Sequence, residues 1–156
     1  MARSRSRAEQ PVERLHRDAY IQLALLAGAH GADIEAICRA EHLTEGHYRI
    51  LWVLCLSDEV DGLTMGDIVD GLVTRAADAT RLVDKLVRLD LVERLADQRD
   101  RRKVIVRPTE AGHRVFLRLT DRIKAVHHQQ WAGLTKAELG QLSALLHKAL
   151  WGRAVA

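Results

Sequence analysis

Apolar residues recur at steps of three and four positions near both ends of the chain, and this spacing predicts long helices there. The first helix is expected over residues 9–40, with a stripe formed by Leu15, Ala19, Leu23, Leu26, Ala27, Ile34 and Ile37. A second is expected to begin at Thr109 and Glu110, with a stripe formed by Val115, Phe116, Leu119, Ile123 and Val126. Thr135 and Glu138 form a capping box before a last helix, whose stripe is Leu139, Leu142, Leu145, Leu146 and Leu150. Stripes this rich in Leu and Ala need a partner to cover them, so burial favours dimerisation through these helices.

Shorter elements are predicted in the middle of the chain. Thr44 is expected to cap a helix with one face formed by Tyr48, Leu51, Trp52 and Cys55. A turn over residues 58–62 leads to a capping box of Thr64 and Asp67, which opens a short helix with Ile68 and Leu72. After a tight connection near Val73, residues 74–89 are predicted to form a longer helix. Its buried stripe is Ala79, Leu82, Val83, Leu86 and Leu89, and its opposite side holds Arg75, Asp78, Arg81, Lys85 and Arg88.

Two strands are predicted next, LVERLA over residues 91–96 and KVIVRP over residues 103–108, separated by a charged tip. A short helix, a tight turn, a longer helix and a charged hairpin together make a winged helix-turn-helix. The predicted fold class is therefore mainly α, with a small two- or three-stranded β-wing and a helical dimerisation domain. We expect the winged helix-turn-helix to be the DNA-binding domain over residues 41–112. The dimerisation domain then takes residues 9–40 and 113–156, and residues 1–8 form a disordered basic tail.

Charge is concentrated in one segment of the chain. The net charge is only +3, but residues 72–107 hold ten Lys or Arg against six Asp or Glu, a surplus of four. Residues 97–112 alone place five cationic side chains and two Asp at and beside the hairpin tip. Like charges on a tip repel one another unless a polyanion lies against them, so this distribution indicates a nucleic-acid surface.

The expected DNA contacts follow from the dimensions of duplex DNA. The major groove admits one α-helix, and an arginine on a hairpin can reach the narrower minor groove, where the negative potential is stronger. The predicted contact residues are Arg75, Ala76, Ala77, Asp78, Thr80 and Arg81 of the longer helix and Arg99, Asp100, Arg101 and Arg102 of the tip. For the helix residues the alternative is an ordinary solvated face.

The segments LTEGHYRILWVL and TRLVDKLVRLDLVERLADQRDRRKVIVRPTEAG resemble the MarR family of bacterial transcription regulators. The tip DQRDRR, followed by a hydrophobic strand and T-E-A-G, is the most specific part of the resemblance, which covers about residues 40–115. It implies a homodimer that binds a pseudo-palindromic operator, usually as a repressor, and that is released by a small aromatic ligand, an oxidant or, in some members, a metal or an acyl-CoA thioester. It also implies that Asp100 orients an arginine, with an internal salt bridge as the alternative, and that Arg102 enters the minor groove.

Three positions depart from the family pattern. Arg75 stands where the family often has Asp or Ser as the N-cap of the recognition helix, and Asp78 is then expected in the first turn. Asp90 stands before the first wing strand, where the family usually has Gly, and Asp tolerates a left-handed backbone less well than Gly. These departures bear on operator preference more than on the fold.

A ligand pocket is expected where the long helices meet the winged lobe, lined by Tyr20, His47, Arg49 and Trp52. Plain core or dimer packing is the alternative for Tyr20 and Trp52. We expect a small-molecule effector but no cofactor.

Other chemistries have weaker signals. None of the eight histidines (16, 30, 42, 47, 113, 127, 128 and 147) pairs at a clear metal-ligand spacing, so no metal site is predicted. Cys38 and Cys55 are expected to be small buried residues of a reducing compartment, with redox sensing as the alternative. No phosphate loop, nucleophile elbow or H-E-x-x-H motif is present, so the chain is not expected to be an enzyme. No uninterrupted apolar run approaches the roughly 18 residues of a membrane span, and we expect a cytoplasmic protein.

The predicted function is therefore that of a homodimeric, sequence-specific DNA-binding transcription regulator. The alternatives are a winged-helix module for protein–protein interaction and a metal- or redox-responsive regulator of the same fold.

Overall fold

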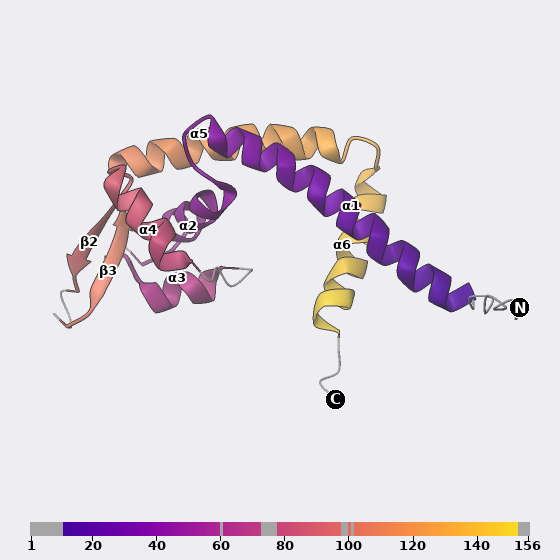
Figure 1. The fold of residues 1–156 in the computed structure, drawn as a ribbon, viewed down its shortest axis with the longest axis horizontal. Coiled ribbons are helices and arrows are strands. Elements are labelled where there is room, and N and C mark those ends of the chain that lie inside the picture. Colours follow the sequence, from indigo (N-terminus) through magenta and orange to yellow (C-terminus); the bar gives the residue numbers. More distant parts are fainter. Residues whose placement is uncertain (1–10, 60, 73–77, 98–99, 101, 153–156) are drawn as a thin grey trace, which may run out of the picture.

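The computed structural model describes residues 11–59, 61–72, 78–97, 100 and 102–152. In chain order its elements are α1 (Pro11–Arg39), α2 (Glu45–Cys55), β1 (Leu63–Thr64), α3 (Met65–Gly71), α4 (Ala79–Arg88), β2 (Val92–Ala96), β3 (Val104–Pro108), α5 (Glu110–Gln130) and α6 (Lys136–Trp151). Helices α2, α3 and α4 and the strands form a lobe beneath one end of α5, whereas α6 and the first half of α1 extend away from it (Figure 1). The described residues thus confirm the mainly helical winged fold that the sequence predicts. The predicted basic tail, residues 1–8, lies outside them.

The wing is a three-stranded antiparallel sheet with the order β1-β3-β2. Strand β2 pairs with β3 so that Val92 faces Pro108 and Leu95 faces Ile105, while Leu63 of β1 faces Val106. Gly62 precedes β1 with φ +111, and a Cβ there would lie 2.7 Å from the carbonyl oxygen of Val106. Only glycine combines that dihedral with so close an approach, so it lets the two-residue strand join the sheet.

Helices α3 and α6 begin at the capping boxes that the sequence predicts. The Thr64 hydroxyl accepts from the backbone N–H of Asp67, and the Asp67 carboxylate accepts from the Thr64 N–H at 3.0 Å. Thr135 and Glu138 make the same reciprocal pair at α6. These bonds satisfy N–H groups that the first helical turn leaves without partners, and the predicted capping boxes are confirmed.

The turn from α4 into β2 uses Asp90 where the family usually has glycine. Asp90 has φ 55, and the next N–H, of Leu91, bonds back to the Leu86 carbonyl, as in a Schellman helix end. The Thr109 hydroxyl donates to the Asp90 carbonyl at 2.7 Å and accepts from the Gly112 N–H at 3.0 Å. The left-handed conformation expected at Asp90 is therefore present, and Thr109 ties it to the start of α5.

Two predictions about the lobe's helices need correction. The buried residues of α2 are His47, Ile50, Leu51 and Leu54, whereas Trp52, predicted to share one face with Leu51, is 44% exposed. Residues 50–55 are all apolar, so periodicity alone could not choose the face. The described part of α4 begins at Ala79, and Asp78 is its N-cap rather than a first-turn residue.

The lobe's core continues into the junction of α1 and α5. Ile37 and Cys38 of α1 are buried with Phe116, Leu119 and Ile123 of α5. Between them, the ring of Tyr48 stacks on Phe116 with centroids 6.0 Å apart. The end of α1 and the start of α5 therefore belong to the same packed unit as the winged lobe.

The outer half of α1 and all of α6 expose the apolar stripes predicted for them. Leu15 is 67% exposed, Leu23 48% and Leu145 65%, and none of the described residues of α6 is buried. By length and composition alone, residues Val12–Arg39 could also cross a membrane, which an inspection of uninterrupted apolar runs misses. A single such helix is weak evidence for a span. Within the same stretch, Asp33 accepts from Gln130 at 2.9 Å and Glu35 from the Glu45 N–H at 2.8 Å, so both carboxylates are engaged by other helices.

Candidate nucleic-acid interface and effector cavity

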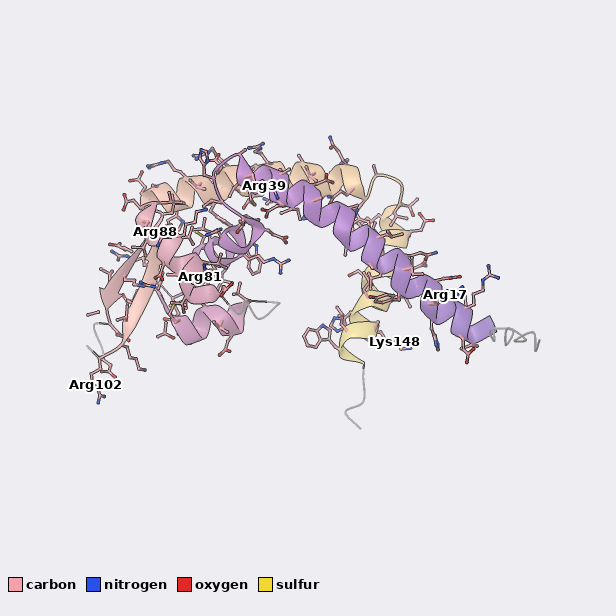
Figure 2. The ribbon with its side chains drawn as sticks, in the orientation of Figure 1. Arg17, Arg39, Arg81, Arg88, Arg102 and Lys148 are labelled. Atoms are coloured by element: carbon pink, nitrogen blue, oxygen red, sulfur yellow. The ribbon has the colours of Figure 1, made fainter. Side chains whose placement is uncertain are left out.

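Helix α4 presents a cationic face opposite its buried stripe. Ala79, Val83 and Leu86 are buried against the lobe, while Thr80, Arg81 and Arg88 are exposed. Figure 2 places Arg81 and Arg88 on the lobe and Arg102 at the far end of the wing. Of the residues predicted to contact DNA, Arg75, Ala76, Ala77, Arg99 and Arg101 lie outside the described residues.

Arg102 projects from the wing and is held in place by hydrogen bonds to Asp100. Its backbone N–H and its Nε both donate to Asp100 Oδ1 at 3.1 Å, and its terminal nitrogen donates to Oδ2 at 3.3 Å. These hydrogen bonds from Arg102 hold the pKa of Asp100 below its usual value. The Arg102 side chain is nevertheless 91% exposed. The structure therefore brings Asp100 and Arg102 together, and the carboxylate orients the guanidinium without covering it.

One ion pair joins the wing to α4, and a second joins the two long strands of the wing. Arg94 of β2 donates to Asp84 of α4 at 2.6 Å, and Arg107 of β3 donates to Glu93 across the strands at 2.8 Å. Arg94 and Arg107, two cations of the basic segment, are therefore neutralised by carboxylates of the protein itself. In the described part of residues 72–107, Arg81, Arg88 and Lys103 have neither an ion pair nor a side-chain hydrogen bond, so together with the exposed Arg102 they are available to face a polyanion.

His47 lies between α2 and α4, away from the other residues predicted to bind a ligand. It is only 4% exposed, and its ring borders a cavity of about 540 Å³. That cavity is lined otherwise by residues of α4 and its N-cap: Asp78, Arg81, Leu82, Asp84, Lys85 and Arg88.

A second cavity, of about 500 Å³, lies between α1, α2, α5 and the end of α3. Arg49 and Trp52 line it as predicted for a shared pocket, whereas Tyr20 lies exposed on the outer part of α1. The other lining residues are Ile34, Glu45, Tyr48, Val53, Gly71, Leu72, Thr120, Ile123, Lys124 and His127. Sequence reasoning missed the α5 contribution. The spacing of Thr120, Lys124 and His127 along one face of α5 was the available signal.

The polar groups of this second cavity differ in how far they are engaged. Arg49 donates to Glu45 at 2.6 Å, and His127 Nδ1 lies 3.0 Å from Gln130 Oε1. Within the described part of the chain, Lys124 has neither an ion pair nor a side-chain hydrogen bond. The cavity therefore combines aromatic and aliphatic walls with one uncommitted ammonium group, a lining suited to an amphipathic anion.

Neither cysteine has the lowered thiol pKa that favours oxidation. Burial raises the pKa of Cys38 to about 11, with the carboxylates of Glu35 and Glu45 adding to the effect. Burial alone raises the pKa of Cys55 to about 11. Both thiols are protonated at neutral pH, which is unfavourable for an oxidant-sensing cysteine. The described residues also contain no group of three or more His, Cys, Asp or Glu side chains that could hold a metal ion.

A capped short helix, a longer helix with an exposed cationic face and an antiparallel hairpin fastened to it define a winged helix-turn-helix protein. Residues 43–103 match the family model described as the MarR family. No curated protein matches the chain. A MarR-family transcriptional regulator from Silicibacter pomeroyi has 28% sequence identity and a TM-score of 0.68, over 88% of this chain and 91% of that one.

Two solved structures of proteins that bind or respond to a small molecule show the same fold. CouR from Rhodococcus jostii RHA1, bound to p-coumaroyl-CoA, matches with 22% identity and a TM-score of 0.74, over 91% of this chain and 98% of that one. BpsR from Bordetella bronchiseptica, whose DNA binding is regulated by 6-hydroxynicotinic acid, matches with 22% identity and a TM-score of 0.72, over 85% of this chain and 98% of that one. The family-model match and these likenesses show that the chain has the winged-helix fold of MarR-family transcription regulators.

Proposed function

We propose that the chain is a homodimeric transcription regulator that binds a pseudo-palindromic DNA operator, acts as a repressor and is released by a small ligand. The observation that carries the proposal is the common surface formed by the exposed cations of α4 and the supported Arg102 of the wing. Arg81 and Arg88 have no carboxylate partner among the described residues, and Arg102 is held outward by Asp100. A helix in the major groove with an arginine reaching a neighbouring minor groove fits this spacing of charge. Arg75, Ala76, Ala77, Asp78, Thr80, Arg99 and Arg101 are assigned to the same surface.

The first half of α1 and all of α6, here called the apolar arms, expose apolar side chains that support a dimer. Residues 9–40 and 113–156 are assigned to dimerisation and residues 41–112 to DNA binding. A second copy of the chain would cover the exposed stripes of α1 and α6 and would place two recognition helices about 34 Å apart, one turn of duplex DNA. A protein of this kind works in the cytoplasm and needs no catalytic group.

The direct test is selection of duplexes from a random library with the purified protein. We expect enrichment of an inverted repeat with half-sites about one helical turn apart. Recovery of no enriched sequence, with a dimer verified in the same sample, would reject the operator assignment. It would favour the winged-helix protein-interaction module, the rival from another functional class.

The cavity lined by Tyr48, Trp52 and Lys124 is assigned to the effector. Its charge and shape suit an aromatic acid or its thioester. Support for that class comes from CouR, which is bound to p-coumaroyl-CoA, and from BpsR, whose DNA binding is regulated by 6-hydroxynicotinic acid. A ligand selective for the native state raises the melting temperature, so both compounds are suitable probes in a thermal-shift assay.

For whichever probe binds, Lys124→Met is expected to lower its affinity about tenfold, because a charge-assisted contact is lost. Lys136→Met, which removes an exposed ammonium group at the start of α6, is the matched control and should bind as wild type does. Equal binding by the Lys124 variant and the wild type would place the effector elsewhere.

A further inference from the structure

His47 occupies the position that a glutamate or glutamine takes in an ordinary capping box. It is the third residue of α2, and its Nδ1 accepts from the backbone N–H of the N-cap Thr44 at 3.0 Å. The Thr44 hydroxyl lies 2.5 Å from the same nitrogen. A ring nitrogen that accepts from a backbone N–H carries no proton, so the geometry assigns His47 the neutral form with its proton on Nε2.

The same corner joins three helices. The Glu35 carboxylate of α1 accepts from the Glu45 N–H at the start of α2. The Lys85 ammonium group of α4 donates to the His42 carbonyl at 2.9 Å, just after α1 ends. His47 is buried, and both Glu35 and Lys85 act electrostatically on its ring. Its ring therefore lies where α1, the first turn of α2 and the recognition helix meet.

We propose that His47 is a positioning residue for the recognition helix, and that a proton on its Nδ1 loosens α4 and weakens DNA binding. This inference rests on the proposed function. Protonation converts Nδ1 from acceptor to donor, so the Thr44 N–H loses its partner. It also places a positive charge beside Lys85 and at the positive end of the α2 dipole.

The charges around the ring act in both directions. Burial lowers the pKa of His47, the Lys85 ammonium lowers it further, and the Glu35 carboxylate raises it. The charged groups that act on the ring are Glu35 of α1 and Lys85 of α4, and the other charged side chains of the cavity that His47 lines are Asp78, Arg81, Asp84 and Arg88. Histidine in an unfolded chain titrates near pH 6.5. With its folded pKa below that value, the junction keeps its full stability above pH 6.5 and loses it as the pH falls from 6.5 through the folded pKa.

The decisive variant is His47→Gln. A glutamine oxygen at this position can accept from the Thr44 N–H, as in the standard capping box, and it does not titrate. We expect the operator affinity of the wild type, relative to that of this variant, to fall by up to about fivefold between pH 7.5 and 5.5 at constant ionic strength, because protonation of a ring whose pKa lies below 6.5 is incomplete at pH 5.5. His113→Gln, at an exposed position of α5, is the control and should follow the wild type. Parallel pH profiles for wild type and His47→Gln would overturn the proposal.

Two further measurements separate this inference from the proposed function. If the wild type binds no duplex at pH 7.5, the regulator assignment fails. The effect of His47 protonation on the helix junction is then tested by hydrogen exchange at the Thr44 amide. This amide should lose protection on acidification in the wild type but not in His47→Gln. Equal protection would overturn it. If the glutamine variant does not fold, an NMR titration of the wild type decides. The ring should titrate below pH 6.5 and the Thr44 amide resonance should follow with the same midpoint, whereas an amide that does not respond to the ring would overturn the proposal.

Discussion

Gly112 shows how much one residue can constrain the joint between wing and helix. It is buried in the first turn of α5, and a Cβ there would lie 2.0 Å from the carbonyl oxygen of Leu91. The carbonyl belongs to the backbone at the start of β2, so it cannot rotate away as a side chain would. The glycine therefore sets the distance at which α5 crosses the base of the wing.

Replacing Gly112 with alanine is expected to destabilise the protein by about 2 to 3 kcal/mol, the usual cost of overpacking. Gly140 offers the matched control, because a Cβ there meets nothing within 4 Å and the residue lies inside α6. Gly140→Ala should be neutral or stabilising by up to about 1 kcal/mol, since alanine favours a helix. Chemical denaturation of both variants measures the difference, and equal stability would show that the close approach at Gly112 is absent in solution.

The cysteines give a second test at the residue scale. With thiol pKa values raised to about 11, Cys38 and Cys55 should react slowly with a thiol reagent at pH 7.5 in the folded protein. The rate should rise steeply as the pH approaches 11, because only the thiolate reacts. Unfolding in denaturant should make both thiols react rapidly at pH 8.5. Rapid labelling of the folded protein at pH 7.5 would revive the redox-responsive alternative.

At the scale of elements, the sequence predicts best where side chains have one dominant local role. Thr64, Thr109 and Thr135 mark helix starts because a hydroxyl before a helical turn meets unpaired N–H groups whatever lies around it. The wing strands are predicted for a similar reason, since two short segments rich in Val, Ile and Leu lie on either side of a charged turn.

Tertiary packing decides what the sequence leaves open. In α2, residues 50–55 are apolar on every side, so its neighbours α4 and α5 select the buried face. His47 was predicted as a ligand contact because it is polar near an expected pocket, but its position is explained by a cap that uses imidazole in place of a carboxylate or amide. The cavity beside Trp52 needs Lys124 and His127 from a helix more than 70 residues away along the chain. No local pattern contains that arrangement.

For the whole molecule, the exposed apolar arms predict that the chain is not a monomer. Leu145 of α6 is 65% exposed in the single chain, and Leu150 is 69% exposed. Light scattering should give twice the 17.5 kDa mass of one chain. Leu145→Glu should shift the mass towards that of one chain, because a buried unpaired carboxylate opposes association.

Val104→Glu is the control for this dimer test. Val104 is an equally apolar, 53% exposed residue on the wing, where the proposed dimer makes no contact. This variant should remain dimeric. A wild-type monomer at micromolar concentration would contradict the assignment of α1 and α6 to dimerisation.

Charge placement extends over the whole molecule as well. The net charge is only +3, yet the cations without carboxylate partners in the described residues of the basic segment lie on α4 and the wing, at one end of the structure. Figure 2 shows Arg81, Arg88 and Arg102 on this lobe, far from Arg17 and Lys148 on the arms. Binding through such a surface releases counterions from DNA, so affinity must fall as salt rises.

The most direct measurement is therefore the salt dependence of duplex binding for wild type, Arg102→Ala and the control Arg114→Ala, which removes an exposed arginine of α5 paired with Glu110. We predict that the wild type's binding constant falls steeply and linearly on logarithmic axes between about 50 and 200 mM salt. Arg102→Ala should bind more weakly with a slope shallower by about one, and with unchanged circular dichroism, while Arg114→Ala should match the wild type. Absence of duplex binding at low salt, or identical affinity for wild type and Arg102→Ala, would contradict the assignment of this lobe to DNA.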